Sequence, residues 1–182
     1  MATILVLYAH PAEDKSQVSK AMFSIANTAT GVTAFDLYAT YPTSRINVAD
    51  QQALLLAHDV IVFLCPVFWY STPAILKDWQ DLVLQYGFAF GPNGDKLKGK
   101  RFLLAMSAGA PAEEYHHDGI NGVSLESLLL PLNKMASLCN MTNEPPFLLY
   151  GTTTAVDDGR LQTHLQQWKS LLQGYITEEL SQ

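Results

Sequence analysis

Short apolar runs alternate with segments of helical periodicity along the whole chain. Runs with the length and β-rich character of strands occupy residues 4–8, 32–37, 60–65, 102–106 and 147–150. Between them, apolar residues recur every three or four positions, which predicts helices near residues 18–25, 48–58, 72–87, 125–139 and 161–176. The unbroken run at 60–65 is typical of a central strand buried on both faces. This alternation predicts right-handed crossovers and a parallel sheet.

Cap and breaker residues mark several ends of these elements. Thr72 and Pro73 predict a helix cap followed by proline at the first helical position, and Gly87 predicts the end of that helix. Pro131 lies inside the helix expected at 125–139, so we expect a kink there. Residues 108–122 form the longest irregular stretch, and long loops in compact domains are often functional.

The expected fold class is α/β, a three-layer flavodoxin-like fold with a five-stranded parallel sheet in the order 2-1-3-4-5. We find no linker, repeat or low-complexity segment, so residues 1–182 are expected to form a single domain. In such a sheet a ligand lies beyond the carboxyl ends of the strands, where strands one and three diverge. This rule selects the loops that follow Tyr8, Cys65 and Met106.

The loop after the first strand has the features of an anion site. It contains no Gly-x-Gly-x-x-Gly and no Walker loop, so a dinucleotide-binding Rossmann turn is not expected. A helix start offers free N–H groups, with hydroxyl and ring donors beside them. The residues expected to bind a phosphate are His10, Ser16, Gln17, Val18 and Ser19. The alternative is that Ser16 is only a helix cap and His10 only a loop histidine.

The two remaining loops favour a flat ligand. Three aromatic residues lie at the end of the third strand, within the segment Pro66, Val67, Phe68, Trp69 and Tyr70. Such rings can line a planar heterocycle, although packing in the core or in a subunit interface also explains them. The fourth strand ends in the small residues Ser107, Ala108, Gly109 and Ala110. Their backbone could approach the edge of a ligand ring, or they could form an ordinary tight turn.

Composition limits the classes of partner. The net charge is −6, which argues against non-specific binding to nucleic acid or to an anionic membrane. Cys65 and Cys139 lie in separate apolar runs and are expected to be free thiols. The five histidines lack a metal-ligand spacing, so no metal is expected. Without a signal-peptide pattern or a run long enough to span a membrane, we expect a cytoplasmic protein.

At these loops the sequence resembles the flavodoxin-like NAD(P)H:quinone oxidoreductases, with the closest resemblance to the ancillary subunits of glutathione-gated potassium efflux systems. The motifs that carry the resemblance are Tyr8-Ala9-His10-Pro11, Leu37-Tyr38 with Tyr41-Pro42, residues 66–73 continuing to Leu76-Lys77-Asp78-Trp79, Gly87-Phe88-Ala89-Phe90-Gly91, and Leu97-Lys98-Gly99-Lys100. The resemblance extends from the first strand to about Pro146, and the blocks at 66–79 and 87–91 are its most specific part.

The resemblance implies a flavin held by the three loops. Residues 10 and 16–19 then match phosphate and ribityl positions, residues 67–70 lie beside the isoalloxazine ring, and residues 107–110 contact its polar edge. The family's catalytic tyrosine and histidine fall on Tyr115 and Asn121. Asn121 cannot exchange a proton near neutral pH, and His116 or His117 could replace the missing histidine. The chain lacks the C-terminal region with which larger members engage FAD, which favours FMN.

Three functions follow as hypotheses. The leading one is a two-electron, ping-pong FMN-dependent NAD(P)H:quinone oxidoreductase, with NAD(P)H and a quinone as small-molecule partners. The second is a regulatory subunit with little turnover, bound to a potassium efflux transporter at the inner membrane face. The third, ranked low, is a one-electron flavodoxin carrier. The resemblance also implies a homodimer, for which the aromatic side chains of Tyr70, Phe88 and Phe90 are suited.

Overall fold

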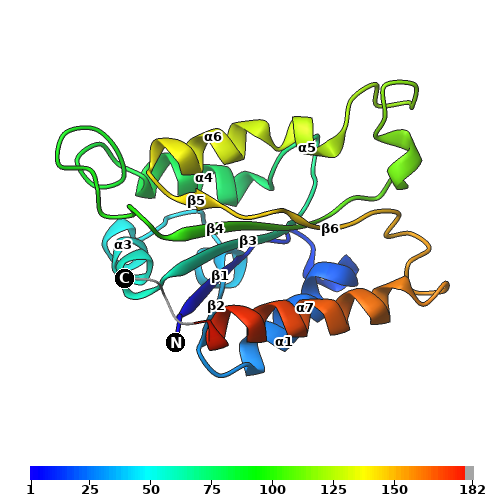
Figure 1. Ribbon diagram of the computed structural model, residues 1–182, viewed down its shortest axis with the longest axis horizontal. Coiled ribbons are helices and arrows are strands. Elements are labelled where there is room, and N and C mark those ends of the chain that lie inside the picture. Colours follow the sequence, from blue (N-terminus) through cyan, green and yellow to red (C-terminus); the bar gives the residue numbers. More distant parts are fainter. Residues whose placement is uncertain (179–182) are drawn as a thin grey trace.

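A twisted parallel sheet forms the middle layer of the molecule (Figure 1). The computed structural model describes residues 1–178. Within them the strands are β1 (Ile4–Tyr8), β2 (Val32–Asp36), β3 (Val60–Pro66), β4 (Arg101–Ser107), β5 (Thr142–Asn143) and β6 (Phe147–Leu149). Their order is β2-β1-β3-β4-β5, β6 also pairs with β4, and all pairings are parallel. The predicted flavodoxin-like fold and strand order are confirmed.

Helices cover both faces of the sheet (Figure 1). One face is covered by α1 (Val18–Thr28) and α7 (Arg160–Thr177). The opposite face is covered by α3 (Val48–Ala57), α4 (Ala74–Val83), α5 (Leu125–Leu128) and α6 (Leu130–Leu138). The short helix α2 (Leu37–Thr40) follows β2, and 3-10 turns occupy Glu13–Lys15 and Ala112–Glu114. In the part described, no helix has the length and apolar character needed to cross a bilayer.

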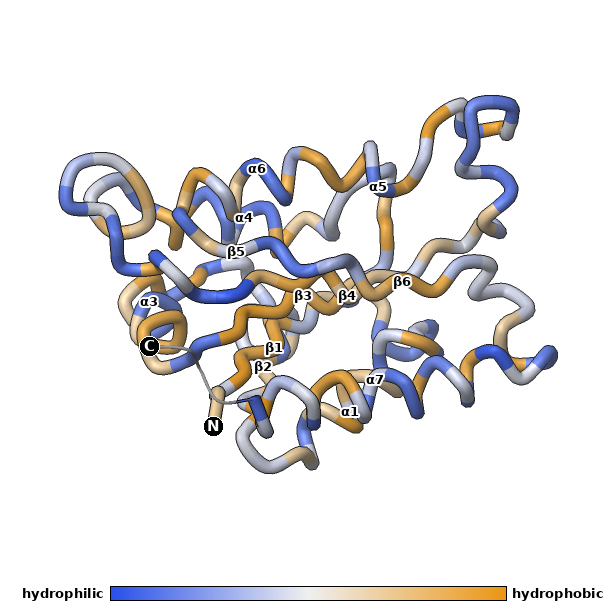
Figure 2. The backbone as a smooth tube through the Cα atoms, viewed as in Figure 1, coloured by the Kyte–Doolittle hydropathy of each residue, from blue (hydrophilic) through white to orange (hydrophobic). Residues whose placement is uncertain are grey.

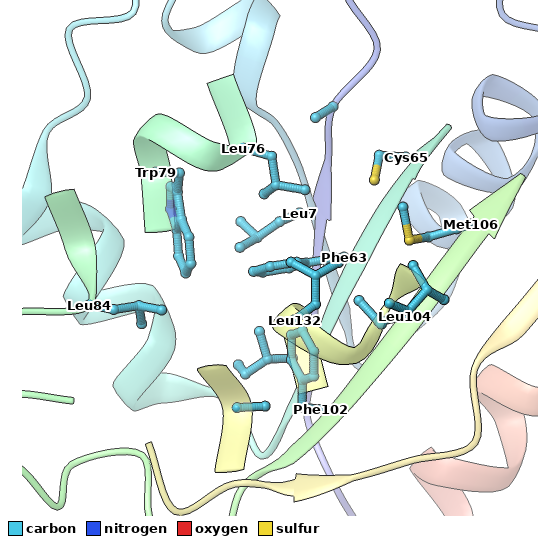
Figure 3. Packing of buried hydrophobic residues seen from close by; sticks show 14 of the residues in the cluster. Leu7, Phe63, Cys65, Leu76, Trp79, Leu84, Phe102, Leu104, Met106 and Leu132 are labelled. Atoms are coloured by element: carbon cyan, nitrogen blue, oxygen red, sulfur yellow. The ribbon is translucent and has the colours of Figure 1, made fainter. Parts of the chain in front are cut away.

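Alternating side chains of the central strands divide the core into two clusters. Figure 2 shows that apolar residues dominate these strands. Phe63 and Phe102 point toward α4 and α6, where Phe63 packs edge-on against Trp79 and Phe102 (Figure 3). On the other face Trp168 of α7 is fully buried, and its indole N–H donates to the Met22 carbonyl at 3.0 Å. Apolar burial on both faces explains why β1 and β3 are continuous hydrophobic runs.

The parallel register places the carboxyl ends of the strands along one edge. Leu64 of β3 pairs with Tyr8 at the end of β1, and Pro66 pairs with Ser107 at the end of β4. Ser107 in turn pairs with Leu149 of β6. The loops that follow these four strands therefore leave the sheet side by side.

The fifth predicted strand is two short strands. Residues 142–143 were not expected to pair, but they form β5 beside the start of β4. Pro145 and Pro146 interrupt the ladder before β6 because proline has no N–H to donate. The second strand ends at Asp36, and Leu37 begins α2. The kink expected at Pro131 is present as a break at Leu129, between α5 and α6.

The helix predicted at 72–87 is shorter at both ends. Pro73 is the N-cap of α4 with an extended ψ of 150°, so Thr72 is not the cap. The apolar side chains of Leu82 and Tyr86, near the end of the predicted segment, are 43% and 68% exposed and lie outside its buried face. The helix ends at Val83 because the following turn forms its own hydrogen bonds, including Phe88 N–H to the Gln85 carbonyl at 3.1 Å.

Candidate functional site

A cavity of about 460 Å³ lies at the carboxyl edge of the sheet. Four loops meet there, those that follow β1, β3, β4 and β6. The volume is in the range of small-molecule and cofactor pockets. Its lining residues are His10, Lys15, Ser16, Gln17, Val18, Ser19, Pro66, Val67, Phe68, Ser107, Gly109, Thr152 and Thr153.

The first turn of α1 offers free donors to this cavity. The Ser16 hydroxyl accepts the Lys20 amide at 3.0 Å, so Ser16 does cap the helix, although Gln17 is the N-cap residue. Among residues 1–178, the amides of Gln17, Val18 and Ser19 donate no hydrogen bond. Unpaired amides at a helix start favour an anion, since the helix dipole is positive there.

His10 presents one defined donor to the same cavity. Its Nδ1 accepts the Ala12 amide at 3.2 Å, so the neutral ring carries its proton on Nε2. Burial lowers the pKa of His10, which keeps the ring neutral near pH 7. The edge of the ring lies against Phe68, with 5.9 Å between centroids. His10 can therefore donate a neutral hydrogen bond and contributes no formal charge.

Buried hydroxyls connect the loops beneath the cavity. The Ser19 and Ser107 hydroxyls lie 3.4 Å apart, joining α1 to the end of β4. Tyr8, fully buried at the end of β1, donates to the Ser16 hydroxyl at 3.4 Å. All three serines also line the cavity, so their hydroxyl groups can rotate toward a bound polar group.

The aromatic segment after β3 forms a strained two-residue hairpin. Phe68 and Ser71 exchange both backbone hydrogen bonds at 3.0 Å. Trp69 and Tyr70 have φ values of 49° and 63°, which is the left-handed pattern of a type I′ turn. Pro66, Val67 and Phe68 line the cavity, whereas Trp69 is 93% exposed and Tyr70 is 51% exposed. The hairpin thus provides an apolar wall and holds two aromatic rings outside it.

The segment after β4 contributes less side-chain surface than expected. Ser107 and Gly109 line the cavity, but Ala108 and Ala110 do not. Ala108 is fully buried, and its amide donates to the Leu149 carbonyl at 2.8 Å. The amides of Gly109 and Ala110 donate no hydrogen bond within residues 1–178, so they remain available to a ligand.

The two expected catalytic residues lie outside the cavity lining. Tyr115 is buried and its ring packs near Tyr150 at 5.6 Å. Burial, and the nearby Tyr70 and Glu114, raise the pKa of Tyr115. The Asn121 side chain donates to the Glu114 carbonyl at 3.1 Å and so closes its own loop. His116 and His117 are exposed on that loop.

Sequence reasoning missed three of the lining residues. Lys15 is the one cationic side chain in the lining. Thr152 and Thr153 come from the loop after β6. The rule on strand ends would have found these threonines if it had also been applied to the last predicted strand, at residues 147–150. Among the residues described, no group of three or more His, Cys, Asp or Glu side chains could hold a metal.

A larger cavity, about 640 Å³, lies between α7 and the start of β4. Its most polar feature is Arg101, which pairs with Glu144 at 2.7 Å and with Glu178. The guanidinium also lies 4.4 Å from the centroid of the Tyr175 ring. Because the carboxylates of Glu144 and Glu178 already neutralise the Arg101 charge, this cavity has fewer free donors than the one at the strand ends.

Comparison with known proteins places the chain in a family. Residues 2–172 match the family described as having a flavodoxin-like fold. The chain belongs to this family. General stress protein 14 of Bacillus subtilis is 42% identical over 170 residues, covering 90% of the chain and 97% of the relative. The glutathione-regulated potassium-efflux system ancillary protein KefG of Enterobacter is 40% identical over 149 residues, covering 82% of the chain and 81% of the relative.

Solved structures of similar proteins carry several names. A general stress protein 14 from Treponema denticola in complex with FMN has a TM-score of 0.89 at 35% identity, covering 95% of this chain and 99% of that one. A protein named thermophilic tryptophan halogenase, from Streptomycin violaceusniger, has a TM-score of 0.85 at 35% identity, and the match covers 98% of this chain and 100% of that one. An NADPH-quinone reductase from P. pentosaceus has a TM-score of 0.83 at 25% identity, and the match covers 93% of this chain and 96% of that one. Because these names differ, the reaction must be argued from the site.

Proposed function

We propose that the protein is an FMN-dependent NAD(P)H:quinone oxidoreductase that transfers two electrons in a ping-pong cycle. The observation that carries this proposal is the cavity at the carboxyl edge of the sheet, with free helix amides on one side and an apolar wall on the other. A phosphorylated planar cofactor requires both features in one site. Support also comes from relatives whose names include an FMN complex and a quinone reductase.

The polar side of the cavity fits a phosphate and a polyol chain. The free amides of Gln17, Val18 and Ser19 would donate to phosphate oxygens. Lys15 would supply a positive charge, which matters in a chain with a net charge of −6. His10 Nε2 and the hydroxyls of Ser19 and Ser107 would donate to the remaining polar atoms. The free amides, Lys15 and the hydroxyls provide for the single phosphate of FMN, which is the flavin that this proposal assigns to the cavity.

The apolar side of the cavity fits the ring system. Pro66, Val67 and Phe68 would exclude water from one side of the isoalloxazine, and the free Gly109 amide would donate to its polar edge. Bound FMN supplies hydride transfer from NAD(P)H and then to a quinone. The exposed rings of Trp69 and Tyr70 would border the place where these two substrates bind in turn.

Tyr115 and Asn121 receive different parts in this proposal. Tyr115 lies close to Tyr70, so its hydroxyl would donate to an oxygen of the quinone as that oxygen gains negative charge. Its raised pKa keeps it protonated and able to donate. Asn121 would act on the loop that carries Tyr115, since its amide is engaged with Glu114.

The absorption spectrum of the purified protein is the first test. We expect a bound yellow chromophore, and NADH or NADPH oxidation that requires a soluble quinone. A colourless protein that shows no such oxidation after FMN is added back would overturn the proposal. NADH and NADPH are both tested as electron donors, because no sequence motif distinguishes them. Reduction in one-electron steps would favour the carrier function instead.

A second candidate function is regulation of a potassium efflux transporter. The similarity to KefG, over 82% of the chain, supports it. In this function the protein is cytoplasmic and lies peripherally at the inner membrane through its partner. Co-purification with such a transporter, and a change in potassium efflux after deletion of this protein, would support it. Unchanged efflux would count against it.

A homodimer belongs to either proposal. Tyr70 is half exposed, and Phe88 and Phe90 are only partly buried, so all three can contribute apolar area to a contact between two copies. Sedimentation velocity at micromolar concentration would show a mass near twice that of the chain. A species of one chain at all concentrations would overturn this part.

A further inference from the structure

The topology gives the cavity two sides of different chemistry. The loops after β1 and β6 lead to α1 and α7, which cover the same face of the sheet. The loop after β3 leads to α4 on the opposite face. The residues that line the cavity from α1 and α7 loops are all polar except Val18, whereas the loop to α4 contributes the apolar wall. Thr152 and Thr153 therefore share a side with the free amides of α1.

We propose that Thr152 and Thr153 bind the phosphoryl group of the ligand, and that Arg160 is the positioning residue that holds their turn. The proposal rests on the FMN site proposed above and adds the loop after β6 to it. Within residues 1–178 neither threonine hydroxyl makes a hydrogen bond, and neither does the Thr153 amide. These groups are free donors on the side where the helix dipole already favours an anion.

The backbone fixes this turn beside the end of β4. The Thr152 amide donates to the Ala108 carbonyl at 3.2 Å, and the Gly151 amide donates to the Ala110 carbonyl at 2.9 Å. Ala108 directly follows Ser107, whose hydroxyl faces that of Ser19 on α1. Ser19 of α1, Ser107 of β4 and Thr152 of the loop after β6 all line the cavity. The phosphate side of the site then spans three elements.

Arg160, at the start of α7, binds the backbone and side chain of residues on both sides of the two threonines. Its Nη1 donates to the Tyr150 carbonyl at 2.6 Å, and its Nη2 donates to the Gly151 carbonyl at 3.1 Å and to the Thr154 hydroxyl at 2.9 Å. Asp158 accepts from Nε at 2.9 Å and fixes the guanidinium itself. Gly151 has a φ of 63°, and a Cβ there would lie 3.2 Å from Nη2. Arg160 does not line the cavity, so it acts through the threonines.

Comparison of FMN with riboflavin isolates the phosphoryl group. Thr152→Val and Thr153→Val keep the shape of the side chain and remove the hydroxyl. In the double variant we expect FMN to bind about 10- to 100-fold more weakly, with riboflavin affinity unchanged within about 2-fold, because only FMN carries the charged group to which the hydroxyls would donate. Quenching of flavin fluorescence measures both dissociation constants. Thr30→Val, at the opposite edge of the sheet, is the matched control.

Three results would overturn the threonine assignment. An equal loss for FMN and riboflavin would place the hydroxyls on the part that the two flavins share. An unchanged FMN affinity would show that the hydroxyls of Thr152 and Thr153 do not bind the flavin. Amide resonances of the wild-type protein titrated with inorganic phosphate provide a flavin-free reading: if residues 17–19 shift and residues 152–153 do not, the assignment is wrong.

A double-mutant cycle tests Arg160. We expect Arg160→Gln to weaken FMN binding with riboflavin spared, and to cause no further loss in the Thr152→Val/Thr153→Val background. A further loss there would make Arg160 a direct phosphate ligand, against the proposal. Wild-type protein that binds no flavin, while phosphate still shifts residues 152–153, would contradict the proposed function and keep this inference for another phosphate ester.

Discussion

His164 is a buried histidine that the proposed chemistry does not use. It lies on α7 with 5% of its surface exposed, and its ring stacks on Phe147 with 4.2 Å between centroids. Within the described chain its Nε2 has no hydrogen-bond partner. Burial lowers the pKa of His164 to about 4. The ring is therefore neutral in the folded protein near pH 7.

This histidine makes stability depend on pH. In the unfolded state the His164 ring has a pKa near 6.5, so between about pH 4 and 6.5 it is protonated there but neutral in the folded state. The free energy of unfolding therefore rises as the pH goes from about 4 to 6.5. At about 1.4 kcal/mol per pH unit the contribution is at most about 3 kcal/mol. Urea unfolding at pH 4.5 and 7 should show a smaller difference in His164→Phe than in the wild type. An identical difference in both would refute the prediction, and His116→Gln is the exposed control.

At the residue scale, the sequence predicted cavity-lining residues where a residue with a polar side chain follows the end of a strand. His10, Ser16, Ser19 and Ser107 were found in this way, and all line the cavity. Ala108 and Tyr115 were expected in the site but do not line the cavity. The Ala108 amide donates to the Leu149 carbonyl of β6, and the Tyr115 side chain is buried in the core. Side-chain direction within a loop depends on such tertiary contacts, which no local pattern records.

At the element scale, the hairpin after β3 holds two bulky residues in left-handed backbone. Such residues cost about 1–3 kcal/mol each, and this strain persists only where the surroundings enforce it. Trp69→Asn with Tyr70→Gly introduces the pair that type I′ turns prefer. We expect the free energy of unfolding to rise by about 1–2 kcal/mol while quinone reduction falls, measured by urea titration and by NAD(P)H oxidation. Lower stability, or activity that is retained, would count against it.

Gln51 ties α3 to α4 and to the loop after α2. It is fully buried, accepts the Trp79 indole N–H at 2.9 Å and donates to the Tyr41 hydroxyl at 3.0 Å. Gln51→Ala leaves that indole N–H without a partner and opens a cavity, so we expect a loss of about 2–4 kcal/mol. Chemical denaturation measures the loss. Gln162→Ala, on the exposed side of α7, should change stability by less than about 0.5 kcal/mol.

Long apolar elements were the easiest to predict, and their ends the hardest. β3 was placed almost to the residue because seven consecutive residues are buried. The start of α4 was wrong by two residues because Pro73 adopts an extended ψ and serves as the cap. β5 could not be predicted, since its two exposed residues pair only because β4 is beside them.

At the scale of the whole molecule, the sheet separates two cores that each contain one buried tryptophan. Trp79 reports on the cluster beneath α4, and Trp168 on the cluster beneath α7. We propose that the chain unfolds as one domain because both clusters share the same strands. In a Trp69→Phe background, Trp79→Phe and Trp168→Phe leave one reporter each, and each variant should give the same midpoint by fluorescence and by circular dichroism. Two separate midpoints would indicate two domains.

The arrangement of the whole sheet was accessible from the sequence because chirality and alternation leave few choices. Right-handed crossovers and buried parallel strands restrict a chain with this pattern to very few orders. Periodicity alone did not fix the order; the flavodoxin-like order 2-1-3-4-5 was the natural choice for five strands, and the structure confirms it. The edge where the cavity lies then followed from that order. The loop after β6 was missed because the rule on strand ends was applied only to the loops after Tyr8, Cys65 and Met106.

The interrupted last strand has a consequence for how the protein behaves when it is crowded. β5 and β6 provide only two and three residues, and Pro145 and Pro146 lie between them. An exposed sheet margin is a template on which a neighbouring chain can add its own strand and start a fibril. Here the template is too short and too irregular to be copied. The same break that obscures the fifth strand in the sequence therefore protects the folded protein from aggregation along this side.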